Sequence, residues 1–251
     1  MAKRVHAAII VGHGSLRSDS GSAMIRIAAR LREQGVAPIV EAGFLNYNRP
    51  TFAEAVAKCL AQGANDIIVQ PYFLIAGVYV VNDLPQLVKA TIPNHNGVHF
   101  HIAEPLGAHS ALVKLAIKRL QAVEPTPDPT TGLLFVAHGT PIESANAPIA
   151  RVLTRVKETA GYGPAALGYL DCNQPDIPTA IDQLVASGVS RLAILPYFLQ
   201  LGRHVCDDLP ALFTQAQFRH PDTEIRVADP LGYDLLLAEA AAERIMSSMT
   251  C

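Results

Sequence analysis

The chain repeats itself at a constant offset of 125 residues, and this repeat limits the possible folds more than any other feature. Nine of the fifteen positions from 71 to 85 are identical 125 residues later, including Pro71–Leu74 with Pro196–Leu199 and Asp83–Pro85 with Asp208–Pro210. His13-Gly14 returns as His138-Gly139. An offset that does not drift indicates two copies of one unit, so the 251 residues divide into halves of about 125.

The composition favours a well-packed globular protein. Half of the residues are apolar and 17% are charged, so each half has enough apolar side chains for a core. A net charge of −2 gives no general electrostatic reason to bind nucleic acid or a membrane surface. No apolar run approaches the roughly 20 residues of a transmembrane helix. We expect neither nucleic acid nor membrane as a partner.

Cysteine usage and the amino terminus both indicate a cytoplasmic protein. The four cysteines show no CxxC spacing, which favours free thiols over disulfides or an iron–sulfur site. The apolar run Val5–Val11 is short, contains His6 and leads directly into the repeated His-Gly motif. We therefore interpret it as a first strand and not as an export signal.

Each half is predicted to alternate strands with helices. Unbroken apolar runs, without apolar/polar alternation, are typical of parallel sheets covered on both faces. The predicted strands are Ala7–Val11, Pro38–Phe44, Asp66–Val69, Val98–Ala103, Leu133–Ala137, Ala165–Leu170, Arg191–Leu195 and Glu224–Ala228. The clearest predicted helices are Ile25–Glu33, Thr51–Gln62, Ala108–Ala122, Ile149–Thr159, Pro178–Ser187 and Leu235–Ser248.

A proline-rich segment separates the halves. Residues 124–132 contain three prolines at alternate positions and no large apolar side chain, as expected of a stiff, exposed connector. We predict an α/β protein with two tandem domains, residues 1–124 and 132–251, each built on an open parallel sheet. The simplest architecture that accounts for this pattern is two such sheets that face each other across a cleft.

Histidines follow the first strand of each half. Open α/β sheets bind ligands beyond the carboxyl ends of their strands, next to the point where the strand order reverses. His13 and His138 occupy that place, and the loops after the third strands carry Tyr79 and His204. First and third strands are expected to be neighbours, so His138 and His204 should open onto one crevice. Two imidazoles there can share a divalent metal or accept a proton near neutral pH.

The differences between the copies help to separate function from structure. Tyr79 stands where the second half has His204, so the fold itself does not require histidine at that position. Glu41 lies in an apolar strand and its counterpart is Ala166, which makes Glu41 a candidate site acid, with a surface glutamate as the alternative. Asp83 and Asp208 precede Leu-Pro, and helix N-capping explains both.

Other charged residues give weaker signals. His95, His99 and His101 are typical of a solvated edge strand, whereas Arg17 and Arg203 are candidates for holding anionic groups. The chain has no Walker loop and no Gly-x-Ser-x-Gly elbow, so neither ATP-driven chemistry nor a nucleophilic serine is indicated.

Together these motifs resemble a known family. An apolar strand ending in His-Gly, followed by Pro-x-Phe-Leu-x-x-Gly-x-His-x-x-x-Asp-Leu-Pro, is similar to the ATP-independent class II tetrapyrrole chelatases, most closely the CbiX-type sirohydrochlorin cobalto- and ferrochelatases. The resemblance covers both halves. It implies two flavodoxin-like domains and insertion of Co²⁺, Fe²⁺ or Ni²⁺ into sirohydrochlorin in a cleft between them, with no ATP and no organic cofactor.

The resemblance also implies roles for individual residues. His138 and His204 would be the metal ligands and proton acceptors, because only the second half keeps both family histidines, and His13 and Glu41 would be further catalytic candidates. Arg17, Arg203 and Tyr79 would contact the carboxylate-rich tetrapyrrole. The long, fused form of the family implies a monomer.

Two rival functions remain open. A histidine phosphotransferase also has His-Gly after a first strand, but such an enzyme favours arginine directly before the histidine, where this chain has Gly12. A non-catalytic tetrapyrrole or metal carrier would keep the fold and lose the catalysis. The presence of both His138 and His204 favours the enzyme.

Overall fold

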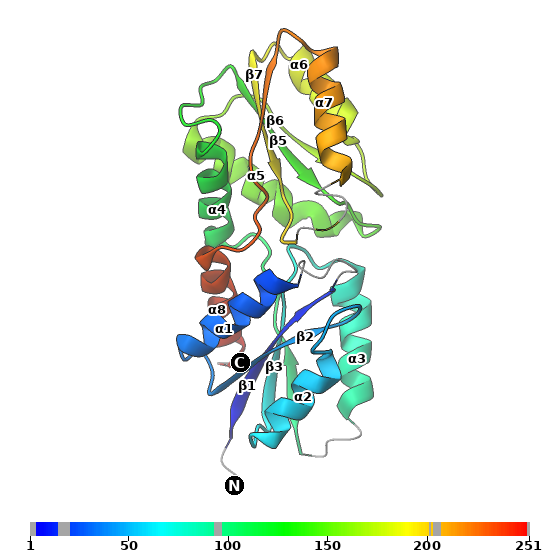
Figure 1. Ribbon diagram of the computed structural model, residues 1–251, viewed down its shortest axis with the longest axis vertical. Helices are drawn as coiled ribbons and strands as arrows, with labels where there is room; N and C mark the ends of the chain where they lie inside the picture. Colours follow the sequence, from blue (N-terminus) through cyan, green and yellow to red (C-terminus); the bar gives the residue numbers. More distant parts are fainter. Residues whose placement is uncertain (1–3, 15–20, 93–96, 201, 203–206, 250–251) are drawn as a thin grey trace. The chain divides into compact units, whose positions relative to one another are not determined.

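The protein consists of two compact α/β units, each with a four-stranded parallel sheet (Figure 1). The computed structural model describes residues 4–14, 21–92, 97–200, 202 and 207–249. The predicted fold class is confirmed. None of the described helices is both long enough and apolar enough to cross a membrane.

The first sheet has the strand order β2-β1-β3-β4, so the first and third strands are neighbours, as predicted. Every predicted strand of this half is present, with its ends shifted by at most two residues. The elements before the second half are β1 His6–Gly12, α1 Ser22–Glu33, β2 Ile39–Phe44, α2 Phe52–Ala61, β3 Asp66–Pro71, the π-helix η1 Tyr79–Asp83, α3 Leu84–Thr91, β4 His99–Ile102 and α4 Ser110–Gln121.

The second sheet repeats this topology with the strand order β6-β5-β7-β8. Its register is also equivalent, because Val136 faces Pro196 as Val11 faces Pro71. The elements are β5 Thr131–Ala137, the 3₁₀ helix η3 Glu143–Asn146, α5 Ala147–Ala160, β6 Ala165–Tyr169, α6 Ile177–Ala186, β7 Arg191–Pro196, α7 Leu209–Arg219, β8 Glu224–Val227 and α8 Leu235–Met249.

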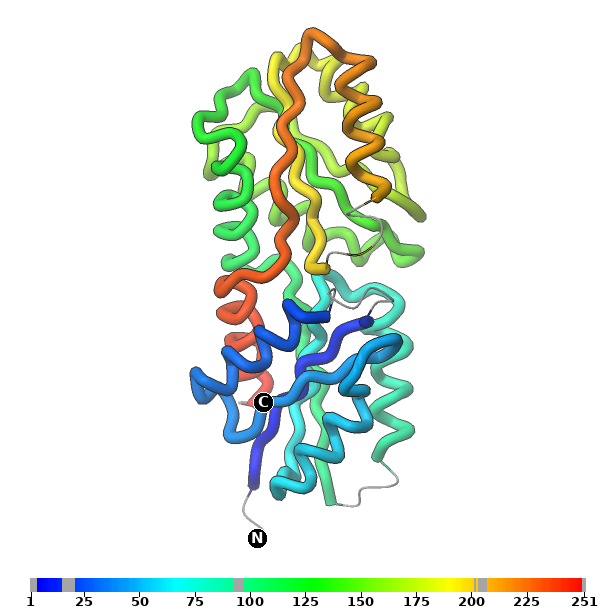
Figure 2. Tube along the Cα trace, in the orientation of Figure 1, coloured from blue at the N-terminus to red at the C-terminus, as the bar shows by residue number. Residues whose placement is uncertain are grey.

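The spatial units differ from the sequence repeats by an exchange of helices. Met1–Gly107 forms one unit with Tyr233–Cys251, and Ala108–Gly232 forms the other. Helix α4 therefore packs on α5 and β7, whereas α8 packs on α1 and β3 (Figure 2). A division at residues 124 and 132 follows the repeat in the sequence, but each sheet is covered by the last helix of the other repeat.

Equivalent arginines anchor the two exchanged helices. Arg119 of α4 donates hydrogen bonds to the carbonyls of Pro230 (3.0 Å) and Leu231 (2.8 Å). Its counterpart 125 residues later, Arg244 of α8, donates to the carbonyl of Leu106 (3.4 Å) and to the carboxylate of Glu104 (2.7 Å). These carbonyls belong to a Pro-Leu-Gly segment that the two copies share, Pro105–Gly107 and Pro230–Gly232, so the exchanged helix is anchored at the same segment in both units.

The core of the first unit forms because β1 is apolar on both faces. Ala7, Ile9 and Val11 pack against α2 and α3, in a cluster with Phe52 and Leu84. The alternate side chains of β1 point to the opposite face of the sheet, which α1 and α8 cover. A strand buried on both faces is what the unbroken apolar run predicts.

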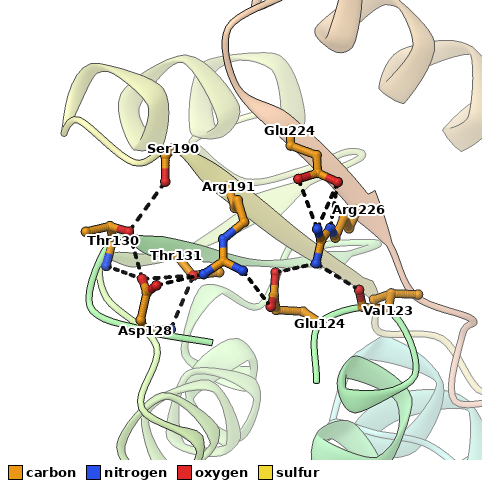
Figure 3. A network of polar contacts seen from close by, with 9 residues as sticks. All are labelled: Val123, Glu124, Asp128, Thr130, Thr131, Ser190, Arg191, Glu224 and Arg226. Carbon is orange, nitrogen blue, oxygen red and sulfur yellow. Dashed lines mark hydrogen bonds and ion pairs between the residues drawn. The ribbon is translucent and has the colours of Figure 1, made fainter. Parts of the chain in front are cut away.

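The segment predicted to be an exposed connector is partly buried. Glu124 is fully buried, and residues 131 and 132 already belong to β5. The carboxylate of Glu124 accepts hydrogen bonds from Arg191 on β7 (3.1 Å) and Arg226 on β8 (2.9 Å) (Figure 3). A buried carboxylate is stable only with such partners, and composition alone gave no sign of them.

The aspartates before Leu-Pro do not cap helices as predicted. Asp83 has helical backbone angles (φ −72°, ψ −46°) and is the last residue of η1, so the chain is already helical when α3 begins. Neither Asp83 nor Asp208 accepts a capping hydrogen bond from the helix that follows it. The prediction failed because a π-helical turn precedes α3, where an extended capping residue was expected.

Replacing Glu124 should destabilise the second unit strongly. Glu124→Ala removes the buried carboxylate that Arg191 and Arg226 share and leaves each arginine only its more exposed partner, Asp128 or Glu224, which should cost about 1.5–3 kcal/mol of unfolding free energy. Urea unfolding followed by circular dichroism measures this loss. Glu158→Ala, at an exposed position of α5, is the matched control and should change stability by less than about 0.5 kcal/mol. Equal effects of the two variants would contradict this role for Glu124.

The Asp128 carboxyl should make stability depend on pH in the acid range. Hydrogen bonds from Thr130 and Thr131, together with Arg191 at 2.7 Å, lower the pKa of Asp128 below its usual value. A lowered folded-state pKa stabilises above the unfolded pKa of about 3.9, and this stabilisation disappears as the pH falls through the folded pKa. Wild type should therefore be more stable than Asp128→Asn at pH 6, and the difference should shrink towards pH 2. A difference that is constant across this range in urea titrations would contradict the role.

Candidate functional site

The two units hold their His-Gly turns with the same backbone hydrogen bonds. In the second unit the amide of Asp171 donates to the carbonyl of His138 (2.9 Å), and in the first unit Asn46 donates to His13 (2.9 Å). Both turns lie at the carboxyl end of the central strand, beside the β1–β3 or β5–β7 pair. This is the switch point at which open α/β sheets bind ligands.

The glycine of each turn is required by its surroundings. Gly139 has φ +90°, and a Cβ there would lie 1.9 Å from the carbonyl oxygen of Asp171. Gly14 has φ +86°, and a Cβ there would lie 1.9 Å from the carbonyl oxygen of Asn46. The His-Gly dipeptide repeats because the turn and the loop after the second strand touch backbone to backbone.

The Pro-Tyr-Phe-Leu motif joins the third strand to this site. The amide of Tyr72 donates to the carbonyl of Val11 (2.8 Å), and the amide of Leu106 donates to the carbonyl of Phe73 (2.9 Å). Tyr197 makes the equivalent bond to Val136 (2.8 Å). The motif is therefore structural. In the first unit, the segment after the motif leads to Tyr79, the first residue of η1, close to the switch point.

In the second unit, a polar cavity lies along the loop whose backbone is bonded to the His138 turn. His138 is exposed, and the loop after β6 places Asp171 and Cys172 beside it. This loop and η3 line a polar cavity of about 480 Å³. Its lining residues are Glu143, Tyr169, Leu170, Asp171, Cys172, Asn173, Gln174 and Asp176. A second hollow of about 370 Å³ lies between α7 and β8, and the described lining residues of both hollows include neither His138 nor any other site residue predicted from the sequence.

Asp171 is a candidate site residue that the sequence alone did not single out. Its backbone amide donates to the carbonyl of His138, it lines the cavity, its carboxylate accepts from the amide of Cys172 (2.7 Å), and the first unit has the neutral Asn46 at the equivalent position. That asymmetry between the copies was a usable signal. The apolar-strand pattern singles out Glu41 because a carboxylate is unusual inside a strand, whereas an aspartate in a loop gives no such local signal.

Glu41 occupies a different environment from the one expected of a site acid. It pairs in register with Ile9, four residues before His13, which is roughly 13 Å along a strand. Its carboxylate lies 3.4 Å from Arg32 and 3.8 Å from Lys58. The structure therefore brings Glu41 together with two surface cations and not with His13.

In the first unit, aromatic rings surround His13. The ring centroid of Tyr79 is 4.2 Å from that of His13, and the ring of Tyr47 is 5.7 Å away. The Nδ1 atom of His13 lies 2.9 Å from the carbonyl oxygen of Gly14, which assigns the donor proton to Nδ1. The structure brings His13 and Tyr79 together, but it gives them no carboxylate among the described residues.

Several predicted residues lie outside the described residues: Arg17, His95, Arg203 and His204. Within the part of the chain that is described, no group of three His, Cys, Asp or Glu side chains is arranged to hold a metal ion. His99 and His101 lie on β4, an exposed edge strand, and His101 is 3.2 Å from the buried carboxylate of Asp66. This agrees with their interpretation as edge residues.

The described cysteines are free thiols, as expected. Burial raises the pKa of the Cys59 thiol to about 12, so this core residue stays protonated at neutral pH. Partial desolvation and Asp171 raise the pKa of the exposed Cys172 thiol. Cys172 therefore lines the cavity as a neutral thiol and not as an activated thiolate.

Comparison with known families decides the assignment. The CbiX family model matches the chain twice, over residues 7–123 and again over residues 132–248. The chain belongs to the CbiX family. The two matches follow the sequence repeat, so each copy has the family's pattern, although each spatial unit contains a helix from both copies.

Individual relatives agree with this assignment. A sirohydrochlorin cobaltochelatase from Priestia megaterium is 24% identical over 94% of this chain and 78% of its own length. The chloroplastic sirohydrochlorin ferrochelatase of Arabidopsis thaliana is 32% identical over 45% of this chain and half of its own. The structure of SirB from Bacillus subtilis with Fe³⁺ superimposes with a TM-score of 0.87 at 18% identity, covering 97% and 95% of the two chains, which shows a shared fold.

Gly139→Ala should lower the free energy of unfolding far more than Gly188→Ala, although both glycines have nearly the same positive φ. Gly188, after α6, has φ +88° and no atom within 4 Å of the place that a Cβ would occupy, so Gly188→Ala should cost about 1 kcal/mol. Gly139→Ala adds the collision with Asp171 and should cost at least about 2 kcal/mol more. Denaturant unfolding of both variants tests this, and equal losses would show that the turn and the loop are not in tight contact.

Proposed function

We propose that this CbiX-family protein inserts a divalent metal ion, Co²⁺ or Fe²⁺, into sirohydrochlorin without ATP. The observation that carries the proposal is the double match to the CbiX family model, together with the placement of the His138 turn at a ligand-binding edge of its sheet. His138 and Asp171 are joined by a backbone hydrogen bond at the switch point of the second sheet, and the loop after β7 carries His204. The relatives named for cobalt and iron chelation support the choice of substrate.

The first unit supports the expected proximity of His138 and His204. His13 and Tyr79 occupy the equivalent positions, and their ring centroids are 4.2 Å apart. Because the two sheets share register and turn hydrogen bonds, and Tyr79 is the counterpart of His204 in the repeat, we propose His204 as the functional partner of His138. The proposed metal-binding set is then His138, Asp171 and His204. Imidazole and carboxylate ligands suit Co²⁺ and Fe²⁺.

These groups match the chemistry of metallation. Insertion breaks two pyrrole N–H bonds of the macrocycle, forms metal–nitrogen bonds and releases two protons. A neutral imidazole either ligates the metal ion or accepts a proton, but one lone pair cannot do both at once. Two histidines divide these roles, and Asp171 offsets the charge of the incoming cation. Arg17 and Arg203 are proposed to hold the carboxylates of the substrate.

Substitutions at the second unit should remove activity, and the equivalent change in the first unit should not. His138→Ala, His204→Ala and Asp171→Asn should each lower kcat for Co²⁺ insertion at least about 100-fold, because each removes a ligand or proton acceptor. His13→Ala should keep kcat within about threefold of wild type. The measurement is the change in sirohydrochlorin absorbance with Co²⁺ under anaerobic conditions without ATP, compared with the enzyme-free rate.

Two outcomes would change the proposal. Loss of activity in Glu41→Gln but not in Asp171→Asn would move the essential carboxylate back to β2. Tetrapyrrole binding by wild type without faster metallation would leave a carrier, the non-catalytic alternative.

A further inference from the structure

The first unit differs from the second at several positions of the same site. The histidine of the turn is kept, as His13 and His138. The other positions change together, since Asn46, Tyr47 and Tyr79 stand where the second unit has Asp171, Cys172 and His204. One carboxylate and one imidazole are thus lost, and two aromatic rings are gained. The first unit therefore presents aromatic rings where the second presents a thiol and an imidazole, and an amide where the second has a carboxylate.

The aromatic residues of the first unit form a continuous group, which we call the aromatic cluster: Phe73, Tyr79, His13 and Tyr47. Tyr79 lies 4.2 Å from His13 and stacks on Phe73 with centroids 6.3 Å apart and planes 26° apart. Tyr47 also contacts His13, edge to face, with ring centroids 5.7 Å apart. The side chains of Tyr47 and Tyr79 are 64% and 42% exposed, so ring surface is available at the carboxyl end of the sheet.

The backbone conformation of Tyr47 supports a role for its ring in ligand binding. Tyr47 has φ +62°, a left-handed conformation that is unfavourable for a bulky residue. The second unit adopts the same conformation at Cys172 (φ +63°), so the loop requires it whatever the side chain. Glycine or asparagine would fit with less strain. A strained backbone that carries an exposed aromatic ring is typical of a ligand site.

We infer that the aromatic cluster binds the flat face of the tetrapyrrole, with Tyr79 and Tyr47 as stacking residues. This inference rests on the proposed function, which supplies a planar, conjugated substrate. Neutral aromatic rings match the apolar face of a macrocycle, whereas its carboxylates need cations that the cluster does not provide. Asn46 and Tyr79 also make the first unit a poor metal site, so substrate bound there does not compete with the metal ion for ligands.

The test separates ring stacking from catalysis. Metal-free sirohydrochlorin is titrated anaerobically into full-length protein, and its absorbance change gives Kd. In parallel, KM and kcat for Co²⁺ insertion are measured. The variants are Tyr79→Ala, Tyr47→Ala and Tyr79→Phe, with Phe218→Ala as the control because Phe218 is an aromatic residue, 89% exposed, outside the cluster. Circular dichroism and thermal unfolding establish that each variant is folded.

Each alanine variant should raise Kd and KM for sirohydrochlorin about three- to tenfold and leave kcat within about twofold, as expected for loss of one stacking ring. Tyr79→Phe should match wild type, because it keeps the ring. Unchanged Kd and KM in both alanine variants would overturn the inference while leaving the chelatase proposal intact. Equal weakening in Tyr79→Phe would assign the contact to the hydroxyl and also overturn stacking. Normal binding without metallation by wild type would refute the chelatase proposal alone.

Discussion

The buried carboxylate of Glu124 is the interaction on which the arrangement of the second unit depends. It follows α4 directly and is held by arginines from β7 and β8, so the end of the exchanged helix is attached to two strands of the sheet that the helix covers. The first unit stabilises the same edge with the charges reversed. Asp66, at the position of Arg191, is buried and lies within 3.4 Å of Arg4, His6 and His101. Each sheet thus has one buried acid at its amino edge, supplied by a different element.

The opposite edge of each sheet holds the candidate site residues, and its backbone contacts are the more strictly repeated of the two. Backbone contacts fix the His-Gly turn against the loop after the second strand, and the third strand is tied to the first by the amide of its tyrosine. None of these bonds uses the side chains that differ between the units. The backbone hydrogen bonds therefore fix the position of each residue at this edge, whereas the type of side chain at that position can differ between the units.

Sequence reasoning succeeded where the signal was local. Apolar runs located every strand within two residues, and the repeat identified the turns and the neighbouring first and third strands. It failed where partners are distant. No local pattern shows that α4 covers the second sheet, because amphipathic helices from either repeat suit either sheet. The sequence makes Glu41 resemble a site acid because it does not show that Arg32 and Lys58 are its neighbours. It likewise does not show that Glu124 is buried, because the partners that make this possible, Arg191 and Arg226, lie far away in the chain.

Duplication removes a conflict that a single site would face. A metal-binding set needs exposed lone pairs and negative charge, whereas the face of a conjugated macrocycle favours neutral aromatic surface. On one site these requirements compete for the same few positions at the strand ends. With two copies of the scaffold, one loop can carry Asp171 and Cys172 while the equivalent loop of the other copy carries Asn46 and Tyr47. Because the backbone bonds are indifferent to these side chains, the specialisation of one copy does not cost the other its stability.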